Sequence, residues 1–399
     1  MPDAAPTSAP VLVVGGGIGG LAACLALNQL GYRVIVIEQS AEIGEIGAGI
    51  QLGPNAFTAM DALGAGERMR RRAVYAERMV MMDAIDGSEV ASVPVGDAFR
   101  ARFRNPYGVI HRADIHLSVY EEVKLARNVD FRTSTRIEQV AMDEHGVRVV
   151  DSKGNAFTGA ALIGADGVKS VVRSHLIGDA HRVSGHVVYR GVVPRDDMPE
   201  DLRWNAAAIW VGPNCHVVHY PLRGGEQYNL VVTFHSRERE EWGVREGSQE
   251  EVLSYFTEIC DSPRRLLHKP TSWKRWSTAD RDPTERWGAG RATLLGDAAH
   301  PMLQYMAQGA CMALEDAVTL REAIKACDGN LEAGFRLYES KRIVRTARVV
   351  YSSREMGRIY HAHGVERLVR NALWKDRTPE RFYDALEWLY GWTAERCLD

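Results

Sequence analysis

Short apolar runs and helix-like segments alternate at the start of the chain. Residues 11–14 form a four-residue apolar run, which is typical of a strand buried on both faces. Residues 18–30 are rich in Ala and Leu and stop at Gly31, which predicts a helix, and residues 33–38 form a second apolar run that ends in an acid. Strand, helix and strand in this order predict the βαβ unit of a doubly wound parallel sheet.

The pattern changes further along the chain. Helices are predicted at 54–63 and 112–126, after which the alternation is irregular. Between residues 185 and 234 several β-rich runs are separated by turns, which predicts a mostly antiparallel sheet inserted in the chain. These runs cover 187–193, 207–211, 215–220 and 228–234. A buried strand at 291–296 then precedes helices predicted at 308–326, 331–361 and 379–392.

Together these segments predict an α/β fold: a discontinuous Rossmann-like cofactor domain, an inserted mostly antiparallel substrate-binding sheet and a helical C-terminus. We expect the cofactor domain to comprise residues 1–75, 106–184 and 281–399, the last of these including the terminal helices. The substrate-binding part is expected to comprise strands within 76–105 and the sheet within 185–280.

Composition narrows the functional classes. The 399 residues are 45% hydrophobic and 25% charged, and the formal net charge of −3 favours no nucleic-acid partner. The six cysteines show no CxxC spacing, so neither a disulfide framework nor a metal site is expected. Residues 1–10 lack the features of a secretion signal, and no apolar run approaches the ~20 residues that span a bilayer. These features predict a cytoplasmic protein without integral membrane association.

The first chemical motif is the glycine-rich turn after residue 14. Gly15, Gly17 and Gly20 fit GxGxxG, in which the glycines permit a tight turn and a close approach to a pyrophosphate at a helix N-terminus. Glu38 follows at close to the spacing of about 20 residues expected for a carboxylate that binds ribose hydroxyls. This motif predicts a dinucleotide site but does not distinguish NAD from FAD.

Two further strand-to-helix turns carry an aspartate. One is Asp166-Gly167 after the apolar run 160–163, and the other is Gly296-Asp297 within the octapeptide 294–301. An Asp at the end of a strand can accept a hydrogen bond from a ribityl hydroxyl, while a helix N-terminus faces the electron-rich end of an isoalloxazine. The structural alternatives are an Asx-turn for Asp166 and a helix N-cap for Asp297.

In this order and spacing, the three motifs resemble those of the group A flavin-dependent aromatic hydroxylases, over essentially the whole chain from Val11. The resemblance implies bound FAD, with GxGxxG on the adenosine half, the Asp166 motif near the cofactor and nicotinamide, and Asp297 on the ribityl chain. It also implies that Arg112 contacts the pyrophosphate, for which an ion pair within the domain is the alternative. A second GxGxxG is absent, as in a family that binds NAD(P)H transiently, so NADH is expected and NADPH stays open.

The inserted sheet holds the candidate substrate residues. On a strand, His216 and Tyr220 share one face about 13 Å apart, whereas His219 points to the other face and is interpreted as structural. A neutral His near pH 7 is a plausible base for a phenol. This segment and residues 301–305 resemble the branch of the family that converts 3-hydroxybenzoate to gentisate. The resemblance implies that His216 is the base, that Tyr220 binds the substrate hydroxyl, and that Gln304 contacts the substrate near the flavin.

The function expected from this resemblance is hydroxylation of 3-hydroxybenzoate para to its hydroxyl, with NADH and O2, by way of a flavin C4a-hydroperoxide. The alternatives are the same chemistry on salicylate or 6-hydroxynicotinate, a non-oxygenating FAD-dependent reductase, or a non-catalytic flavoprotein. A monomer or a homodimer is expected. No arginine can be assigned from the sequence to the substrate carboxylate.

Overall fold

The computed structural model describes residues 9–44 and 48–399, so the expectation for residues 1–10 lies almost wholly outside the described part. A five-stranded parallel sheet forms around the first predicted strand, in the order β19-β12-β1-β2-β8. Its strands are β1 (Val11–Val14), β2 (Val34–Ile37), β8 (Val129–Arg132), β12 (Ala161–Gly164) and β19 (Ala292–Leu294). The five strands lie side by side although up to about two thirds of the chain separates them. They do so because each crossover connection returns the chain to the same sheet.

Apolar side chains on both faces hold this sheet in place. All residues of β1, β2 and β12 are buried, which explains why their sequences are continuous apolar runs rather than alternating ones. Helix α1 (Ile18–Gln29) packs on the sheet between α5 (Arg112–Val123) and α9 (Gly309–Ala326). The observed bounds of β1, α1 and β2 lie within one or two residues of the predicted ones.

The second sheet has eight strands in the order β17-β18-β13-β16-β15-β14-β5-β6, and all its pairs are antiparallel except β14 with β5. Its strands are β5 (Arg78–Asp83), β6 (Glu89–Pro94), β13 (Arg182–Pro194), β14 (Ala206–Gly212), β15 (Cys215–Leu222), β16 (Gln227–His235), β17 (Gly243–Glu246) and β18 (Lys274–Asp280). One face packs an apolar cluster against α7 (Gln249–Tyr255) and α8 (Asp261–Leu267). The other face is left for the site.

Two smaller sheets and several helices complete the fold. An antiparallel sheet follows the helix predicted at 112–126 and consists of β9 (Ile137–Asp143), β10 (Gly146–Asp151) and β11 (Ala156–Gly159). The sequence pattern did not predict this sheet. The other small sheet consists of β3 (Gly49–Leu52), β7 (Gly108–His111) and β4 (Val74–Tyr75). The remaining short helices are α2 (Pro54–Ala62), α3 (Gly66–Arg72), α4 (Asp97–Phe103) and α6 (Val171–Leu176).

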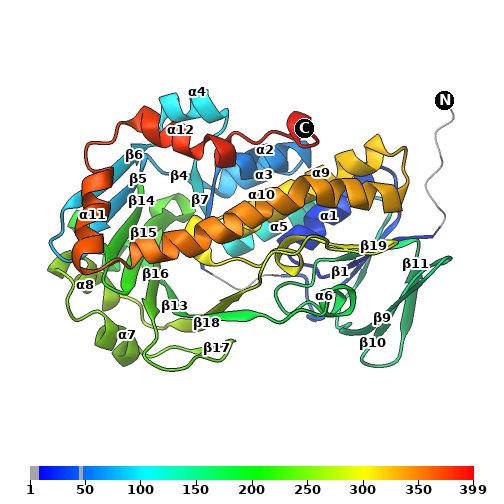
Figure 1. Cartoon of the computed structure of the whole chain (residues 1–399), viewed down its shortest axis with the longest axis horizontal. Helices are drawn as coiled ribbons and strands as arrows, with labels where there is room; N and C mark the ends of the chain where they lie inside the picture. Colours follow the sequence, from blue (N-terminus) through cyan, green and yellow to red (C-terminus); the bar gives the residue numbers. More distant parts are fainter. Residues whose placement is uncertain (1–8, 45–47) are drawn as a thin grey trace.

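The 30-residue helix α10 (Leu331–Tyr360) connects the two halves of the molecule. It begins near the parallel sheet and runs along the molecule to the eight-stranded sheet, where α11 (Gly364–Trp374) follows (Figure 1). Helix α12 (Pro379–Tyr390) then folds back over α4, and its Phe382 and Leu389 are buried in an apolar cluster with Phe99. The terminal aromatic segment therefore covers part of the core.

The described residues show neither a membrane-spanning helix nor a metal site. No helix in 9–44 or 48–399 is long and apolar enough to cross a membrane. Within the same ranges, no cluster of three or more His, Cys, Asp or Glu side chains is arranged to hold a metal ion.

Candidate active site

The glycine turn between β1 and α1 is built by close backbone packing. Gly15 has φ +109°, and a Cβ placed on it would lie 2.2 Å from the carbonyl oxygen of Ala165. A Cβ on Gly20 would lie 2.0 Å from the carbonyl oxygen of Gly15. Gly17 is the N-cap of α1 and makes no side-chain cap, so the first N–H groups of the helix remain available to an anion. These glycines therefore create the space and the donors that a pyrophosphate needs.

Glu38 follows β2 and closes the same turn. Its carboxylate accepts hydrogen bonds from the backbone N–H of Gly16 at 2.7 Å and of Ser40 at 2.8 Å. The side chain is only partly buried and lines the central cavity. A carboxylate oriented in this way still has acceptor positions for ribose hydroxyls.

The Asp166 turn has a structural task as well as a place in the cavity wall. Its carboxylate accepts from Ser170 Oγ at 2.5 Å and from the Val171 N–H at 2.8 Å, so it caps α6. Burial raises the pKa of Asp166. Gly167 and Arg112, the first residue of α5, line the same cavity. The Asx-turn was the structural alternative for Asp166; the contacts observed instead join Asp166 to the start of α6, and the residue still lines the cavity.

The Gly296-Asp297 turn (η4, Gly296–Ala298) faces the N-terminus of α9. Asp297 Oδ1 lies 3.7 Å from the position that a Cβ on Gly309 would occupy, and Gln308 at the N-cap of α9 provides no side-chain cap. A carboxylate and uncapped helical N–H groups therefore border the same part of the cavity. This combination suits a polyol chain next to an electron-rich ring.

A buried ion network supports that turn from behind. Asp316 of α9 accepts from the Gly296 N–H at 3.0 Å, from His300 Nε2 at 2.5 Å and from Arg342 Nε of α10 at 2.6 Å. Arg342 also binds Glu315 at 2.6 Å. These contacts hold the pKa of Asp316 at about 2, with His300 and Arg342 offsetting its burial. The octapeptide is thereby anchored to both α9 and α10.

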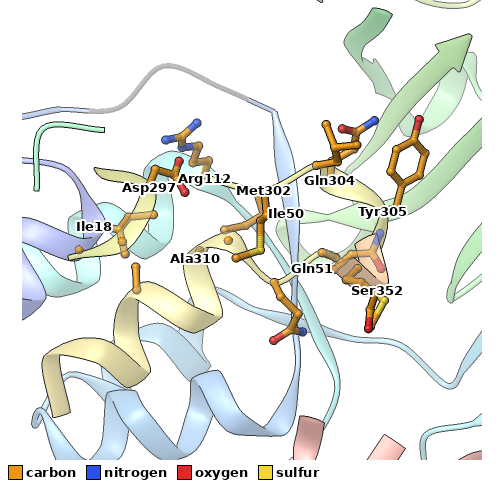
Figure 2. Close-up of a pocket in the computed structure, with 18 of the residues that line it drawn as sticks. Ile18, Ile50, Gln51, Arg112, Asp297, Met302, Gln304, Tyr305, Ala310 and Ser352 are labelled. Carbon is orange, nitrogen blue, oxygen red and sulfur yellow. The ribbon is translucent and has the colours of Figure 1, made fainter. Parts of the chain in front are cut away.

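All these elements border one cavity of about 1640 Å³. Figure 2 shows Asp297 and Arg112 at one end of the view and Gln304 and Tyr305 at the other, with Met302 and Ala310 between them. The cavity lining also includes His216 and Tyr220 from β15. Of the residues expected from the sequence, only Gly20 lies behind the wall, where it packs against Gly15.

The β15 strand separates two kinds of side chain, as its alternation predicts. His216, Val218 and Tyr220 face the cavity, whereas Val217 packs into the apolar cluster on the opposite face. His219 also lies away from the cavity, with its ring 5.5 Å from that of Trp204, and neither of its ring nitrogens has a partner among the described residues. The structural interpretation of His219 fits this position.

The three candidate catalytic side chains differ in their electrostatics. Burial, followed by the nearby His186, lowers the pKa of His216 to about 3, so His216 is neutral at physiological pH. Burial raises the pKa of Tyr220, which therefore remains a protonated donor. Gln304 lies in η5 (Gln304–Met306), and its Nε2 is buried without a hydrogen-bond partner among the described residues. Each group thus has hydrogen-bonding capacity that a ligand can use.

Two residues of the site are not marked by the sequence: His361, which lies behind the cavity wall, and Arg190, which lines it. His216 Nδ1 lies 2.9 Å from Nε2 of His361, which directly follows α10 and is 145 positions away in the chain. Arg190 of β13 lines the cavity near Tyr220 and forms no hydrogen bond or ion pair with any described residue. No local motif marks either residue. The only signal for Arg190 was its position on a β-rich run, one residue after the inward-packing Tyr189.

The residues present fit FAD. The glycine turn leaves no room for side chains where a pyrophosphate would approach, and Glu38 and Asp297 offer carboxylates at separate parts of one cavity. The unpartnered Gln304 amide and the uncapped N-terminus of α9 lie further along it. These features define the class of an FAD-binding protein with a second, polar ligand compartment.

Comparison with known proteins agrees with that class. Residues 8–353 match the family described as FAD binding domain. The chain is 66% identical to 3-hydroxybenzoate 6-hydroxylase of Polaromonas naphthalenivorans (strain CJ2), over 98% of each chain. It is 61% identical to 3-hydroxybenzoate 6-hydroxylase of Klebsiella oxytoca, over 97% of this chain and 98% of the relative.

A solved structure of Klebsiella pneumoniae HpxO complexed with FAD superposes with a TM-score of 0.82 at 25% identity, covering 95% of this chain and 97% of that one. The chain belongs to this FAD-binding family and, within it, to the FAD-dependent aromatic monooxygenases. The predicted fold class, the cofactor FAD and the enzyme class are therefore confirmed.

Proposed function

We propose that this enzyme hydroxylates 3-hydroxybenzoate para to its hydroxyl group, giving 2,5-dihydroxybenzoate, with NADH as reductant and O2 as oxidant. The observation that carries the proposal is the second compartment of the cavity, which a buried neutral histidine, a protonated tyrosine and an unpartnered amide line beyond the residues that fit FAD. The two relatives at 66% and 61% identity, named as 3-hydroxybenzoate 6-hydroxylases, support the same substrate over salicylate and 6-hydroxynicotinate.

When bound, FAD would accept two electrons from NADH and activate O2, so that one oxygen atom could be transferred to the aromatic ring and the other released as water. The chain's own residues prepare the ring for that transfer. His216 takes the proton of the 3-hydroxyl at Nε2, because its Nδ1 is engaged with His361. An ionised hydroxyl raises the electron density at its para position, which is carbon 6 of 3-hydroxybenzoate. Proton removal by His216 therefore activates this carbon together with the two ortho carbons, and the orientation of the ring selects among them.

Tyr220 and Gln304 orient the ring. The phenol of Tyr220 stays protonated, because burial raises its pKa, and it donates to the substrate oxygen as negative charge develops there. Gln304 presents its Nε2 donor from η5, which follows the turn that carries Asp297 along the chain. Donors on two sides of a ring restrict both its rotation and its distance from the flavin.

Arg190 is our candidate for the substrate carboxylate. In the sheet register Arg190 is level with Val231, and Val231 is level with Val218, which lies between His216 and Tyr220 on β15. Arg190 therefore stands two strands from the catalytic pair, roughly 10 Å between backbones, on the same face. Burial lowers its pKa, but an arginine remains a cation. A desolvated cation without an acidic partner in the described structure favours an anionic ligand.

The proposal is tested by purifying the flavoprotein and following NADH oxidation with 3-hydroxybenzoate, salicylate and 6-hydroxynicotinate, with product identification. We expect 3-hydroxybenzoate to accelerate NADH oxidation and to yield 2,5-dihydroxybenzoate in near-stoichiometric amounts. If 3-hydroxybenzoate gives no product while another ring is hydroxylated, the substrate assignment is wrong. NADH oxidation without any hydroxylated ring would favour a non-oxygenating reductase instead.

A further inference from the structure

Four histidines and a tyrosine form a continuous group from the cavity wall to the protein surface. His216 lines the cavity and is 3% exposed, and His361 behind it is 7% exposed. The ring of His361 is 5.2 Å from that of His186, which is 5.0 Å from the ring of the exposed His235. Tyr305, which also lines the cavity, lies with its hydroxyl 2.6 Å from His186 Nδ1.

The fold holds this group in place from several directions. His186 and His235 are directly paired across β13 and β16, and His216 is on the adjoining strand β15. His361 arrives from the end of α10, and its carbonyl oxygen accepts from the Asn214 N–H in the turn before β15 at 3.1 Å. Three strands of the substrate sheet and the helix that spans the molecule therefore meet at one point.

A base in this position must transfer the proton that it takes up to another group. Burial lowers the pKa of His216 to about 3 and that of His186 to about 4, and it lowers the pKa of His361 well below its usual value. A lasting imidazolium at His216 is therefore unfavourable. No carboxylate in the described structure faces His361, so none would stabilise an imidazolium there. The titratable groups around it are His216, His186, His235, Tyr305 and Tyr360, and Arg182 acts on His186.

We infer that His361, His186 and His235 form a proton relay that carries the substrate's hydroxyl proton from His216 to solvent, an inference that rests on the proposed function. As the substrate O–H bond breaks, its proton bonds to His216 Nε2 and the proton on His216 Nδ1 moves to His361 Nε2. His361 then releases its Nδ1 proton toward His186, by a small ring rotation or through a bridging water. The proton leaves to water from His235, and the net charge left behind is the bound phenolate.

Tyr305 has a separate part in this arrangement. Its hydroxyl oxygen accepts from the protonated Nδ1 of His186 in the tautomer that the relay requires, so Nε2 of His186 carries the lone pair that takes the proton from His361 and then passes it on to His235. His361 and His186 act through His216, so they are positioning and relay residues, and only His216 and Tyr305 border the cavity. The relay therefore predicts effects on proton movement with little effect on FAD binding.

The test compares His361→Gln with His219→Gln. Glutamine keeps a hydrogen bond to His216 but takes up no proton at physiological pH, and His219 provides the same replacement on the other face of β15. The full-length holoenzyme is mixed rapidly with 3-hydroxybenzoate between pH 6 and pH 9, and the appearance of the phenolate absorbance of the bound ligand is followed. A relay determines how fast the proton leaves, so we expect His361→Gln to slow this appearance about tenfold, while His219→Gln leaves the rate unchanged.

A second measurement follows the released proton itself with a pH-indicator dye on rapid mixing of holoenzyme and substrate. His235→Gln, at the exposed end of the relay, is expected to slow proton release about tenfold while keeping the FAD content of the wild type. If the rates of phenolate formation and of proton release in both relay variants equal those of the wild type, the relay is disproved and His361 has a structural role only. If the wild type neither ionises nor hydroxylates 3-hydroxybenzoate, the proposed function is disproved. The relay, which rests on that function, is then disproved as well.

Discussion

The two ends of the cavity are built by different means. The cofactor end depends on backbone: glycines that tolerate no Cβ, helix N-termini without side-chain caps, and carboxylates that directly follow strands. The substrate end depends on side chains from β13, β15, η5 and the end of α10, which are far apart in the sequence. The difference explains why short motifs revealed the cofactor, whereas part of the substrate compartment became visible only in the fold.

This difference between the two ends predicts that the cofactor end loses its FAD when a side chain replaces one of its glycines. Gly20→Val places a Cβ about where the Gly15 carbonyl oxygen already lies, 2.0 Å away, so the turn cannot keep its shape. We expect FAD content to fall to background, measured by flavin absorbance of the purified protein. Gly243→Val is the control, because a Cβ there meets nothing within 4 Å. A Gly20→Val protein that retains full flavin would contradict the backbone account.

The substrate end should instead be sensitive to acid. Burial lowers the pKa of His216 to about 3 and of His186 and His219 to about 4, and that of His361 well below its usual value. Below pH ~6.5 the unfolded chain binds protons that the folded state does not, so the free energy of unfolding falls as pH falls, down to the folded pKa values. Each histidine contributes about 1.4 kcal/mol per pH unit in this window.

Denaturant unfolding at pH 7, 6 and 5, followed by tryptophan fluorescence, measures this dependence. Four tryptophans of the substrate half, Trp204, Trp210, Trp273 and Trp276, report on it. His219→Leu should reduce the slope by about 1.4 kcal/mol per pH unit, since one buried neutral histidine is removed. A slope that is the same in that variant would show that other groups govern acid unfolding.

A single side chain at the substrate end should change chemistry without changing the cofactor. His216→Gln preserves a polar group at the cavity wall but cannot accept the substrate proton, so we expect product formation to fall by roughly 10² to 10⁴. FAD content should equal that of the wild type. The measurement is product formed per NADH oxidised, with His219→Gln as control. Normal coupled turnover in His216→Gln would exclude His216 as the base.

The smallest expected effect concerns substrate affinity. Arg190→Met removes the cation proposed for the carboxylate, and a charged hydrogen bond of about 2 kcal/mol corresponds to a KM roughly 30-fold higher. Steady-state kinetics with 3-hydroxybenzoate and with its uncharged amide measure the effect, which should be much smaller for the amide. Arg245→Met, on exposed β17 of the same sheet, is the control. Equal loss for both substrates would remove Arg190 from the carboxylate site.

The sequence predicted most of the fold, because the informative signals were local. Buried runs such as residues 11–14 became central strands, and the four β-rich runs after residue 185 became β13 to β16. The sheet of β9 to β11 was missed because its strands are half-exposed, and charged or polar residues interrupt their apolar positions, so they form no continuous apolar run. The roles of the site residues remain predictions, including those of Gly15, Asp166 and Asp297, although the structure places these residues around one cavity.

By itself, the sequence determined the cofactor turn and the face of β15, since a glycine requirement and a two-residue strand period are properties of adjacent residues. Only the tertiary structure decided which distant groups complete the substrate compartment. Arg190 enters through the register of β13 with β16, and His361 through the length of α10, which carries it to His216 across the molecule. Neither placement leaves a local pattern, because packing between elements, rather than propensity within them, determines it.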